Sequence, residues 1–475
     1  MNFQLYTKGG LPVYFHFEDA KEQGELATFA LDHGFKGKRG EAFYLPGVKG
    51  EGALLLGLGE TEKLDEEAFR LAGHRAYLEA KKYHEAELEF TMPEMDFCNR
   101  KTLMSIYEGL YQGSYAFSHK TEDEDEFELT INYTPFKGKE EKIKSGKAYT
   151  EAVMDGVFFA RELTNETSNI ITPELLAEAA ESTLSPLGVN VTVYEEEELS
   201  EMGFDAFLAV AKGSENGPRL IVMEYRGDED SDDVTGLVGK GLTYDSGGYC
   251  IKSPGGMVDM HSDMAGSATV MGTLLALAKA QAKVNVTGVV AACENLISGS
   301  AYKTGDIISS LSGKTIEVGN TDAEGRLTLA DAIYYATSEL KVNRVIDLAT
   351  LTGAAVVGLG HLYTAALTND EEFYAALTEA AKAAGEKIWP LPNDPAYKKQ
   401  FSSKVADLKN TGRLGAGTIT AGQFVGEFVH GDTPWIHLDI AGTAYLPEAM
   451  GYLPARATGV QVKTLFRLLH PLQSH

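Results

Sequence analysis

Apolar and polar residues recur along the chain with two different periods. Residues 52–59 ("GALLLGLG") form a short apolar run typical of a strand, and residues 65–83 have the three-and-four spacing of an amphipathic helix. The same helical spacing recurs over 147–163, at Tyr149, Val153, Val157 and Ala160. Thr172 followed by Pro173 predicts the N-cap and the first residue of a further helix.

Beyond residue 165 the two patterns alternate regularly. Strands are expected at 219–225, 234–241, 284–294 and 344–351, and helices begin at Ala265 and Arg326. Such alternation predicts an α/β fold in which a mostly parallel central sheet is flanked by helices. We therefore expect a smaller N-terminal α/β domain (1–145), a connecting helix (146–164) and a larger C-terminal domain (165–475).

Composition and charge exclude several classes of function. The 475 residues are 44% hydrophobic and carry a formal net charge of −27, which disfavours nucleic acid and anionic membranes as partners. The cysteines Cys98, Cys250 and Cys293 form no paired framework, and no apolar run reaches the roughly 18 residues of a membrane span. With no recognisable leader at the start, the sequence predicts a soluble cytoplasmic protein. Acidic runs are expected to be solvated turns, at 122–126, 195–198 and 227–233.

Charged residues gather where the predicted strands end and the next helices begin. In a parallel sheet that edge is where ligands bind. Two lysines and four acids fall there: Lys240 at the end of the 234–241 strand, then Asp245, Lys252, Asp263, Asp322 and Glu324.

Several acids in one cleft raise each other's pKa, and divalent cations relieve that repulsion. Carboxylates with one nitrogen donor and no thiolate suit zinc, manganese or magnesium. Four carboxylates exceed what one small ion needs and suit a two-metal site. His261 lies in the same segment and is a further candidate ligand. Each acid alone would more commonly be a helix cap or turn residue, and each lysine alone a surface residue.

The motifs themselves resemble a known family. "NTDAEGRL" (320–327), "VGKGLTYDSGGYCIK" (238–252) and the intervals from Lys240 to Asp245, Lys252 and Asp263 resemble the leucyl aminopeptidase family, the dinuclear cytosol aminopeptidases. The likeness extends from about Arg161 to the C-terminus. "DSGGY" and "ENLISGSAYKTGDII" look most like the bacterial peptidase B branch, which is associated with broad specificity that includes acidic residues. Thr304 and Gly319 stand where many members carry proline and aspartate, and only local loop changes are expected.

The resemblance implies a role for each residue. Asp245 and Glu324 would bridge two divalent ions (Zn²⁺ or Mn²⁺, with Mg²⁺ as an option at one site), Lys240 and Asp263 would complete the shell of one ion, and Asp322 that of the other. Lys252 would polarise the scissile carbonyl, and Arg326 would hold a bicarbonate that relays the proton from the attacking water. By similarity the pocket for the first side chain is lined by Met260, Thr350, Leu351, Gly353 and Ala441.

The implied activity is removal of single residues from peptides with a free N-terminus, by a homohexamer. Three alternatives stay open. A phosphoesterase could use the same metal pair with Arg326 and Lys252 as phosphate ligands. A nucleotide- or DNA-binding module is disfavoured by the net charge of −27, and no G-x-G-x-x-G motif or basic stripe supports it. A metal-free pseudoenzyme is disfavoured because all seven key positions are filled.

Overall fold

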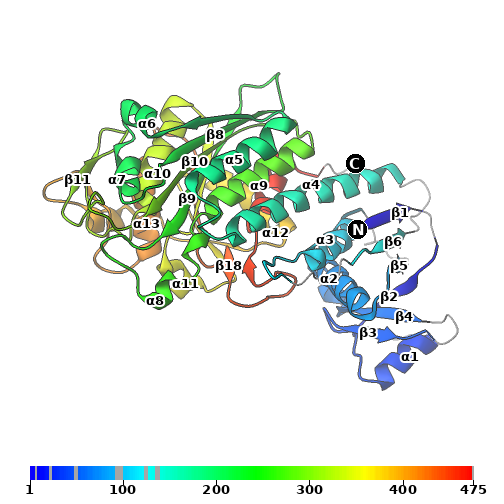
Figure 1. Ribbon diagram of the computed structural model, residues 1–475. Helices are drawn as coiled ribbons and strands as arrows, with labels where there is room; N and C mark the ends of the chain where they lie inside the picture. The colour runs from blue at the N-terminus through cyan, green and yellow to red at the C-terminus, as the bar shows by residue number, and fades with distance from the viewer. Residues whose placement is uncertain are drawn as a thin grey trace. The chain divides into compact units, whose positions relative to one another are not determined.

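The computed structural model describes residues 1–5, 8–20, 24–47, 52–90, 100–121, 127–133 and 140–472. Cys98 and the acidic run 122–126 lie outside the described residues. The chain forms two compact units, one of residues 1–154 with 449–454 and one of residues 155–448 with 455–475 (Figure 1). Both are α/β units built on a sheet, and the expected α/β fold with a mostly parallel central sheet flanked by helices is confirmed.

The N-terminal unit is built on a six-stranded sheet in the order β1-β6-β5-β2-β4-β3, in which only β3 runs antiparallel to its neighbour. Its strands are β1 (Asn2–Leu5), β2 (Leu11–Phe17), β3 (Ala42–Leu45), β4 (Ala53–Gly59), β5 (Glu87–Phe90) and β6 (Thr130–Tyr133). Its helical segments are α1 (Glu25–Asp32), η1 (Thr61–Lys63), α2 (Glu66–Tyr83), α3 (Arg100–Ser114) and the first part of α4 (Glu140–Asn165).

The local sequence of α2 determines where this helix begins and which of its faces packs into the core of the unit. Asp65 caps the helix by accepting a hydrogen bond from Ala68 N, and the apolar face of α2 packs with α3 over the strands. Phe69, Leu54 and Ile106 are almost fully buried in the resulting core. The first unit therefore has a hydrophobic core of its own.

The larger unit is built on an eight-stranded mixed sheet in the order β15-β14-β17-β13-β9-β10-β8-β7. The four central strands, β17, β13, β9 and β10, are mutually parallel, and antiparallel pairs occur towards both edges. Its strands are β7 (Asn190–Tyr194), β8 (Arg219–Arg226), β9 (Val234–Asp245), β10 (Asn285–Asn295), β13 (Arg344–Ala349), β14 (Thr364–Thr368), β15 (Ile388–Pro390) and β17 (Trp435–Asp439).

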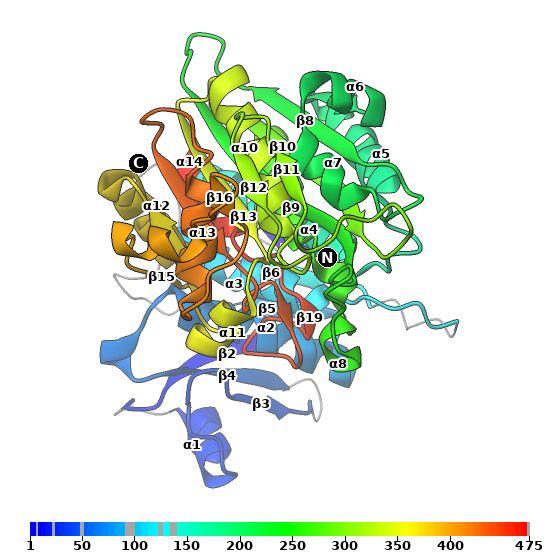
Figure 2. The same cartoon turned by 90° about the vertical axis from the view of Figure 1, so that its left-hand side faces the viewer.

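Helices cover both faces of this sheet. One face is covered by α5 (Pro173–Leu184), α9 (Ala265–Lys279) and α12 (Glu371–Ala384). Outside them, α14 (Val462–Leu469) packs on α9 and α12, and the second half of α4 packs on α9 where Gly156 meets Gly272. The other face, turned to the viewer in Figure 2, carries α7 (Asp205–Ala211), α10 (Gly325–Tyr334) and α13 (Gly417–Gly426). Parallel strands need cover on both faces, and β9 and β10 are accordingly apolar and buried along almost their whole length.

Shorter elements complete the larger unit. The helical ones are η2 (Ser185–Leu187), α6 (Glu196–Met202), α8 (Pro254–Met257), η3 (Met260–Ser262), the π-helical turn η4 (Tyr335–Glu339), α11 (Gly353–Leu359) and η5 (Pro395–Phe401). Two small sheets contain β11 (Ile307–Ser309), β12 (Thr315–Glu317) and β16 (Leu408–Lys409), and β18 (Tyr445–Leu446) with β19 (Arg456–Ala457).

Most expected elements are present, and four details differ. Strand β9 continues to Asp245, so Lys240 lies within the strand and not at its end. Residues 195–198 do not form a turn, because Glu195 and Glu198 make a capping box that starts α6. The helix expected from Arg326 changes to π-helical geometry at Tyr335. The strand before Asp322 belongs to the small β11-β12-β16 sheet and not to the central one. Among the described helices, none combines the length and apolarity needed to cross a bilayer.

Candidate metal centre

Strand β9 brings the first two charged residues of the site to one side of the sheet. Lys240 and Asp245 are five residues apart, so simple alternation would place them on opposite faces. The pairing of β9 with β10 skips Thr243, and this bulge shifts the alternation by one residue. Lys240 and Asp245 consequently both reach Glu324 or its immediate surroundings, although each is only 2% exposed.

The segment before α10 supplies two further acids. Asn410 braces its backbone, because the Asn410 amide oxygen accepts from Gly319 N and its amide nitrogen donates to Asn320 O. Glu324 then stands at the first turn of α10, directly before Gly325. A Cβ at Gly325 would lie 2.8 Å from Lys240 Nζ, so only glycine lets the helix approach the lysine this closely.

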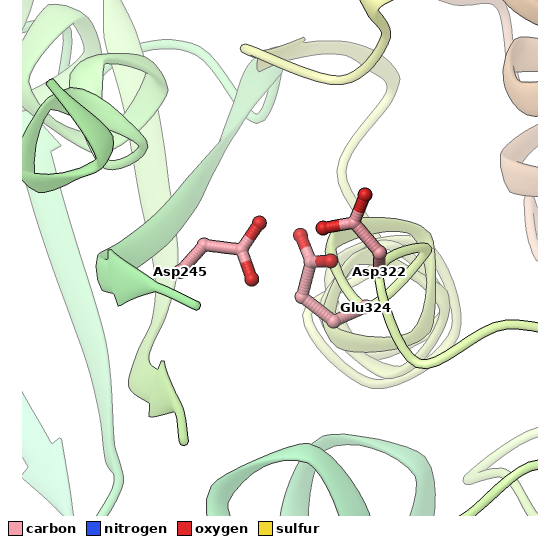
Figure 3. Close-up of side chains that lie close together, drawn as sticks. All are labelled: Asp245, Asp322 and Glu324. Atoms are coloured by element: carbon pink, nitrogen blue, oxygen red, sulfur yellow. The ribbon is translucent and has the colours of Figure 1, made fainter. Parts of the chain in front are cut away.

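Four acids and two lysines meet at the carboxyl end of β9. Lys240 Nζ lies 2.8 Å from Asp263 Oδ2 and 2.9 Å from Glu324 Oε1. Lys252 Nζ lies 2.7 Å from Asp245 Oδ2 and 2.5 Å from Asp322 Oδ1. Oxygen atoms of Asp245, Asp322 and Glu324 lie within 4.8 Å of one another, and Figure 3 shows the three carboxylates pointing toward a common centre.

Burial makes this excess of acid unfavourable. Burial, followed by the neighbouring Glu324, raises the pKa of Asp245 to about 6, and burial raises the pKa of Asp263 to about 8. Burial alone would lower the pKa of Lys240, but the carboxylates of Asp263 and Glu324 outweigh it and raise that pKa. A cluster with more acids than bases must take up either protons or a cation.

The donor atoms fit a divalent cation. Glu324 Oε2 is buried and has no hydrogen-bond partner within the described part of the chain. Asp263 Oδ2 and Asp322 Oδ1 have a lysine nearby but no aligned hydrogen bond. Buried carboxylate oxygens without donors, next to an amine, are the ligand set of zinc- or manganese-type ions. The residues present therefore fit such an ion.

Arg326 is the second residue of α10, and not all of its N–H donors are used. Its Nη1 donates to Asn410 O at 2.8 Å, whereas its buried Nε has no hydrogen-bond partner among the described residues. Burial lowers the pKa of Arg326 to about 10, which still leaves the guanidinium charged at neutral pH. The side chain can therefore bind an anion next to the acid cluster.

The expected pocket residues differ in whether they contact the charged cluster or the residues around it. Thr350 touches the cluster directly: its carbonyl accepts from Lys240 Nζ at 3.0 Å, and its hydroxyl donates to Asp263 at 2.7 Å. The backbone N–H groups of Leu351 and Ala441 both donate to Asp439.

The remaining candidates lack such contacts. Gly353 is the exposed first residue of α11, and Met260 is the half-buried first residue of η3. No recorded hydrogen bond or ion pair among described residues joins either one to the acids. His261 packs its ring against Tyr445, with the centroids 5.7 Å apart, and is not part of the three-acid group.

Sequence reasoning missed three residues that orient the charged groups. Asn295 donates to Asp245 Oδ1 at 2.8 Å and to Thr321 O at 3.0 Å, and so links two acid-bearing segments. Asn410 braces the 319–323 backbone, and Asp439 holds the Leu351 and Ala441 amides. A buried polar residue at the end of an apolar strand, as at Asn295 and Asp439, was the available signal.

Family models and curated relatives match most of the chain. The family model for the catalytic domain of the cytosol aminopeptidase family matches residues 158–466, and the model for that family's N-terminal domain matches residues 13–123. A probable cytosol aminopeptidase of Treponema denticola is 47% identical over 472 residues, covering 99% of both chains. One of Clostridium tetani is 45% identical over 461 residues, covering 96% of this chain and 95% of the relative.

Solved structures resemble the whole chain as well. A mutant of tomato leucine aminopeptidase matches with a TM-score of 0.89 and 32% identity, covering 99% of this chain and 96% of the tomato chain. The bottromycin maturation enzyme BotP in complex with Mn matches with a TM-score of 0.86 and 30% identity, covering 97% and 98%. On the strength of both family models and of relatives that span nearly its full length, the chain belongs to the cytosol aminopeptidase family of metallo-exopeptidases.

Proposed function

We propose that this metallo-aminopeptidase holds two divalent ions between its four acids and Lys240 and uses them to hydrolyse the first peptide bond of a substrate. The observation that carries the proposal is the meeting of Asp245, Asp322 and Glu324 at one point, with Asp263 and Lys240 beside them. Asp245 and Glu324 would contact both ions, Lys240 and Asp263 one ion, and Asp322 the other. BotP, a structural relative, is described in complex with Mn.

When bound, such ions supply Lewis acidity, which lowers the pKa of a shared water molecule and offsets negative charge in the transition state. The chain's part is to hold its acids ionised and its lysine deprotonated. The second requirement is demanding, because a free lysine has a pKa near 10.4. Burial of Lys240 favours the neutral amine once other cations neutralise the surrounding carboxylates.

Lys252 is proposed to donate a hydrogen bond to the scissile carbonyl oxygen. Its amine lies between the carboxylates of Asp245 and Asp322, and its side chain is less buried than that of Lys240. When cations take over the oxygens of these two acids, Lys252 is free to turn its charge toward the substrate. A preorganised donor of this kind typically lowers the barrier by about 3–4 kcal/mol.

Arg326 is proposed to bind bicarbonate, whose role would be to accept and pass on the proton of the attacking water. The support is the buried Nε with no hydrogen-bond partner among the described residues, together with the single recorded bond from Nη1 to Asn410 O. Lysine replacement at this position would keep the charge but lose the planar set of donors. Arg326→Lys should therefore lower kcat, and added bicarbonate should not restore it.

The substrate is proposed to be a peptide with a free N-terminus, with leucine-type first residues preferred and acidic ones accepted. Acceptance of acidic residues rests on the likeness of 245–249 and 294–308 to the peptidase B branch. Met260, Thr350, Leu351, Gly353 and Ala441 are proposed to line the pocket for the first side chain. Hydrolysis of leucyl, glutamyl and aspartyl arylamides tests this, and hydrolysis of leucyl substrates alone would remove the peptidase B assignment.

Assembly and organisation are also proposals. We propose a cytoplasmic homohexamer, so light scattering should give six times the chain mass of 51.4 kDa. We further propose that residues 165–475 carry the chemistry, that 146–164 connect, and that 1–145 play no direct part in it. Single substitutions in 1–145 that preserve folding should then leave kcat unchanged.

The decisive experiment is metal quantitation with a panel of aminoacyl arylamides and a nitrophenyl phosphate. The proposal expects about two ions per chain and hydrolysis of the arylamides only. Phosphate ester hydrolysis without arylamide hydrolysis would favour a phosphoesterase instead.

A further inference from the structure

Asp439 is a buried acid that no step of the proposed mechanism uses. It is the last residue of β17 and only 1% exposed. Its Oδ1 accepts hydrogen bonds from Leu351 N at 3.2 Å and Ala441 N at 3.1 Å, and its Oδ2 accepts from the Thr352 hydroxyl at 2.6 Å. Burial raises the pKa of the Asp439 carboxyl, whereas the neighbouring His437 and the donors on both oxygens act in the opposite direction and favour the ionised form.

One of these bonds leads directly to the metal centre. The N–H of Leu351 and the carbonyl of Thr350 belong to the same trans peptide, so they point in opposite directions. On the far side, Thr350 O accepts from Lys240 Nζ at 3.0 Å. A single peptide plane therefore lies between the Asp439 carboxylate and the Lys240 amine.

A second link runs through the Thr350 side chain. Its hydroxyl donates to Asp263 Oδ1 at 2.7 Å, which leaves Asp263 Oδ2 facing Lys240. Thr350 thus fixes the orientation of both residues through its own backbone and side chain. On the other side, Thr352 extends the support from Asp439 to the Thr418 hydroxyl of α13, 2.9 Å away.

We propose that Asp439 is a positioning residue for the metal centre: through the Thr350–Leu351 peptide it fixes the Lys240 amine and the Asp263 carboxylate, and so sets the affinity for the ion that these two would hold. The inference rests on the proposed function, because it assigns those two residues to one ion. The amine keeps N–H groups whether or not it is protonated, so its bond to Thr350 O survives a change of charge state.

The physical basis is the polarised chain of hydrogen bonds. An anion at the N–H end of an amide makes its carbonyl a stronger acceptor, and hydrogen bonds in series strengthen one another at low dielectric. Removing a group that hydrogen-bonds to a metal ligand and orients it typically lowers metal affinity by about 10- to 100-fold. A buried aspartate that only stabilised the fold would affect unfolding but not metal affinity.

The chain offers a matched control in Asp331. It is also fully buried in the same unit, and its two oxygens accept from Phe207 N at 2.9 Å and Leu311 N at 2.8 Å, neither of which contacts the acid cluster. Asp331→Asn should cost stability and leave metal affinity within about twofold of wild type, since no ligand is repositioned. Lys240→Ala serves as the reference that identifies which binding step depends on the amine.

The test is calorimetric titration of the metal-free full-length protein with Mn²⁺. Lys240→Ala should abolish one binding step. For that same step, Asp439→Ala should lower the Mn²⁺ affinity by about 10-fold or more. Asp439→Asn keeps the hydrogen bonds but not the charge, so a loss of about threefold is expected for the same step. If Asp439→Ala does not fold, Asp439→Asn alone decides.

Equal Mn²⁺ affinities for wild type and Asp439→Asn, or a loss shared equally by Asp331→Asn, would overturn the proposal. Failure of the proposed function looks different. In that case the wild-type protein itself would bind no Mn²⁺ and would not hydrolyse a leucyl arylamide.

Discussion

The two units each bury a cluster of charged side chains, and the clusters differ in how their charges balance. In the N-terminal unit, Arg70 is 1% exposed and reaches three acids: Glu108 at 3.0 Å, Glu67 at 3.1 Å and Glu66 at 3.5 Å. Only Glu108 is fully buried, because the side chains of Glu66 and Glu67 are 25% and 33% exposed. One buried positive charge thus faces one buried negative charge.

In the larger unit the buried acids outnumber the buried bases. Asp245, Asp263 and Glu324 are 2%, 5% and 2% exposed, so even without the partly exposed Asp322 three buried acids face two lysines. Glu324 Oε2 has no hydrogen-bond partner among the described residues. A balanced buried cluster neutralises its own charge, whereas a surplus of buried acid calls for a cation that is not part of the chain. The following variants test this difference.

The largest effect is expected at the acids that point to the common centre. Glu324→Ala or Asp245→Ala should remove metal and aminopeptidase activity together, lowering kcat/KM by at least about a thousandfold because the ion supplies the main electrostatic stabilisation. Elemental analysis and leucyl arylamide hydrolysis measure both. Full metal content in either variant would mean that these acids are not ligands.

The balanced cluster should respond in stability and not in chemistry. Arg70→Met leaves Glu108 buried without its arginine, and breaking such a pair typically costs about 3–5 kcal/mol. Urea unfolding measures the loss, and metal affinity of the folded protein should be unchanged. A change in metal affinity as large as that of Glu324→Ala would erase the distinction between the clusters.

Lys252→Ala should separate metal binding from catalysis. The variant is expected to keep its metal and to lose kcat by about 100- to 1000-fold, because the carbonyl loses a charged donor. Metal content and steady-state kinetics on the same preparation test it. A kcat equal to that of wild type would remove the proposed role of Lys252.

The smallest effect concerns Asp331, which lies away from both clusters. Burial raises the pKa of this carboxyl from 3.8 to about 7. Because the raised pKa belongs to the folded state, protonation favours folding. The stabilisation is complete below the unfolded value of 3.8 and is lost as the pH rises through about 7.

Wild-type stability should therefore fall by about 1–4 kcal/mol between pH 5 and pH 8 relative to Asp331→Asn, which does not titrate. Urea unfolding of both proteins at the two pH values measures the difference. If the unfolding free energies of the two proteins changed with pH in the same way, ionisation of Asp331 would not destabilise the folded state.

Much of the fold and of the site follows from local sequence. The residues 320–327 form a short linear motif, and apolar runs such as 285–295 locate the central strands. The position of Lys240 and Asp245 at a predicted strand end indicated a shared site. The length of β9 and its bulge at Thr243 did not follow from the sequence, since both depend on pairing with β10.

The sequence did not predict the long-range hydrogen bonds that orient the charged residues. Asn295 reaches Asp245 across 50 positions, and Asn410 reaches Asn320 across 90. The Asp439 bond to Leu351 spans 88. Such contacts depend on which strands and loops become neighbours, and a single sequence does not encode that in any local pattern.

The most direct test of the central claim is a chelation and reloading series on the wild-type protein. Metal-free protein should lose leucyl arylamide hydrolysis while staying folded, and stepwise addition of Mn²⁺ or Zn²⁺ should restore activity in proportion to bound metal. Full hydrolysis by protein whose metal content is below detection would contradict the account.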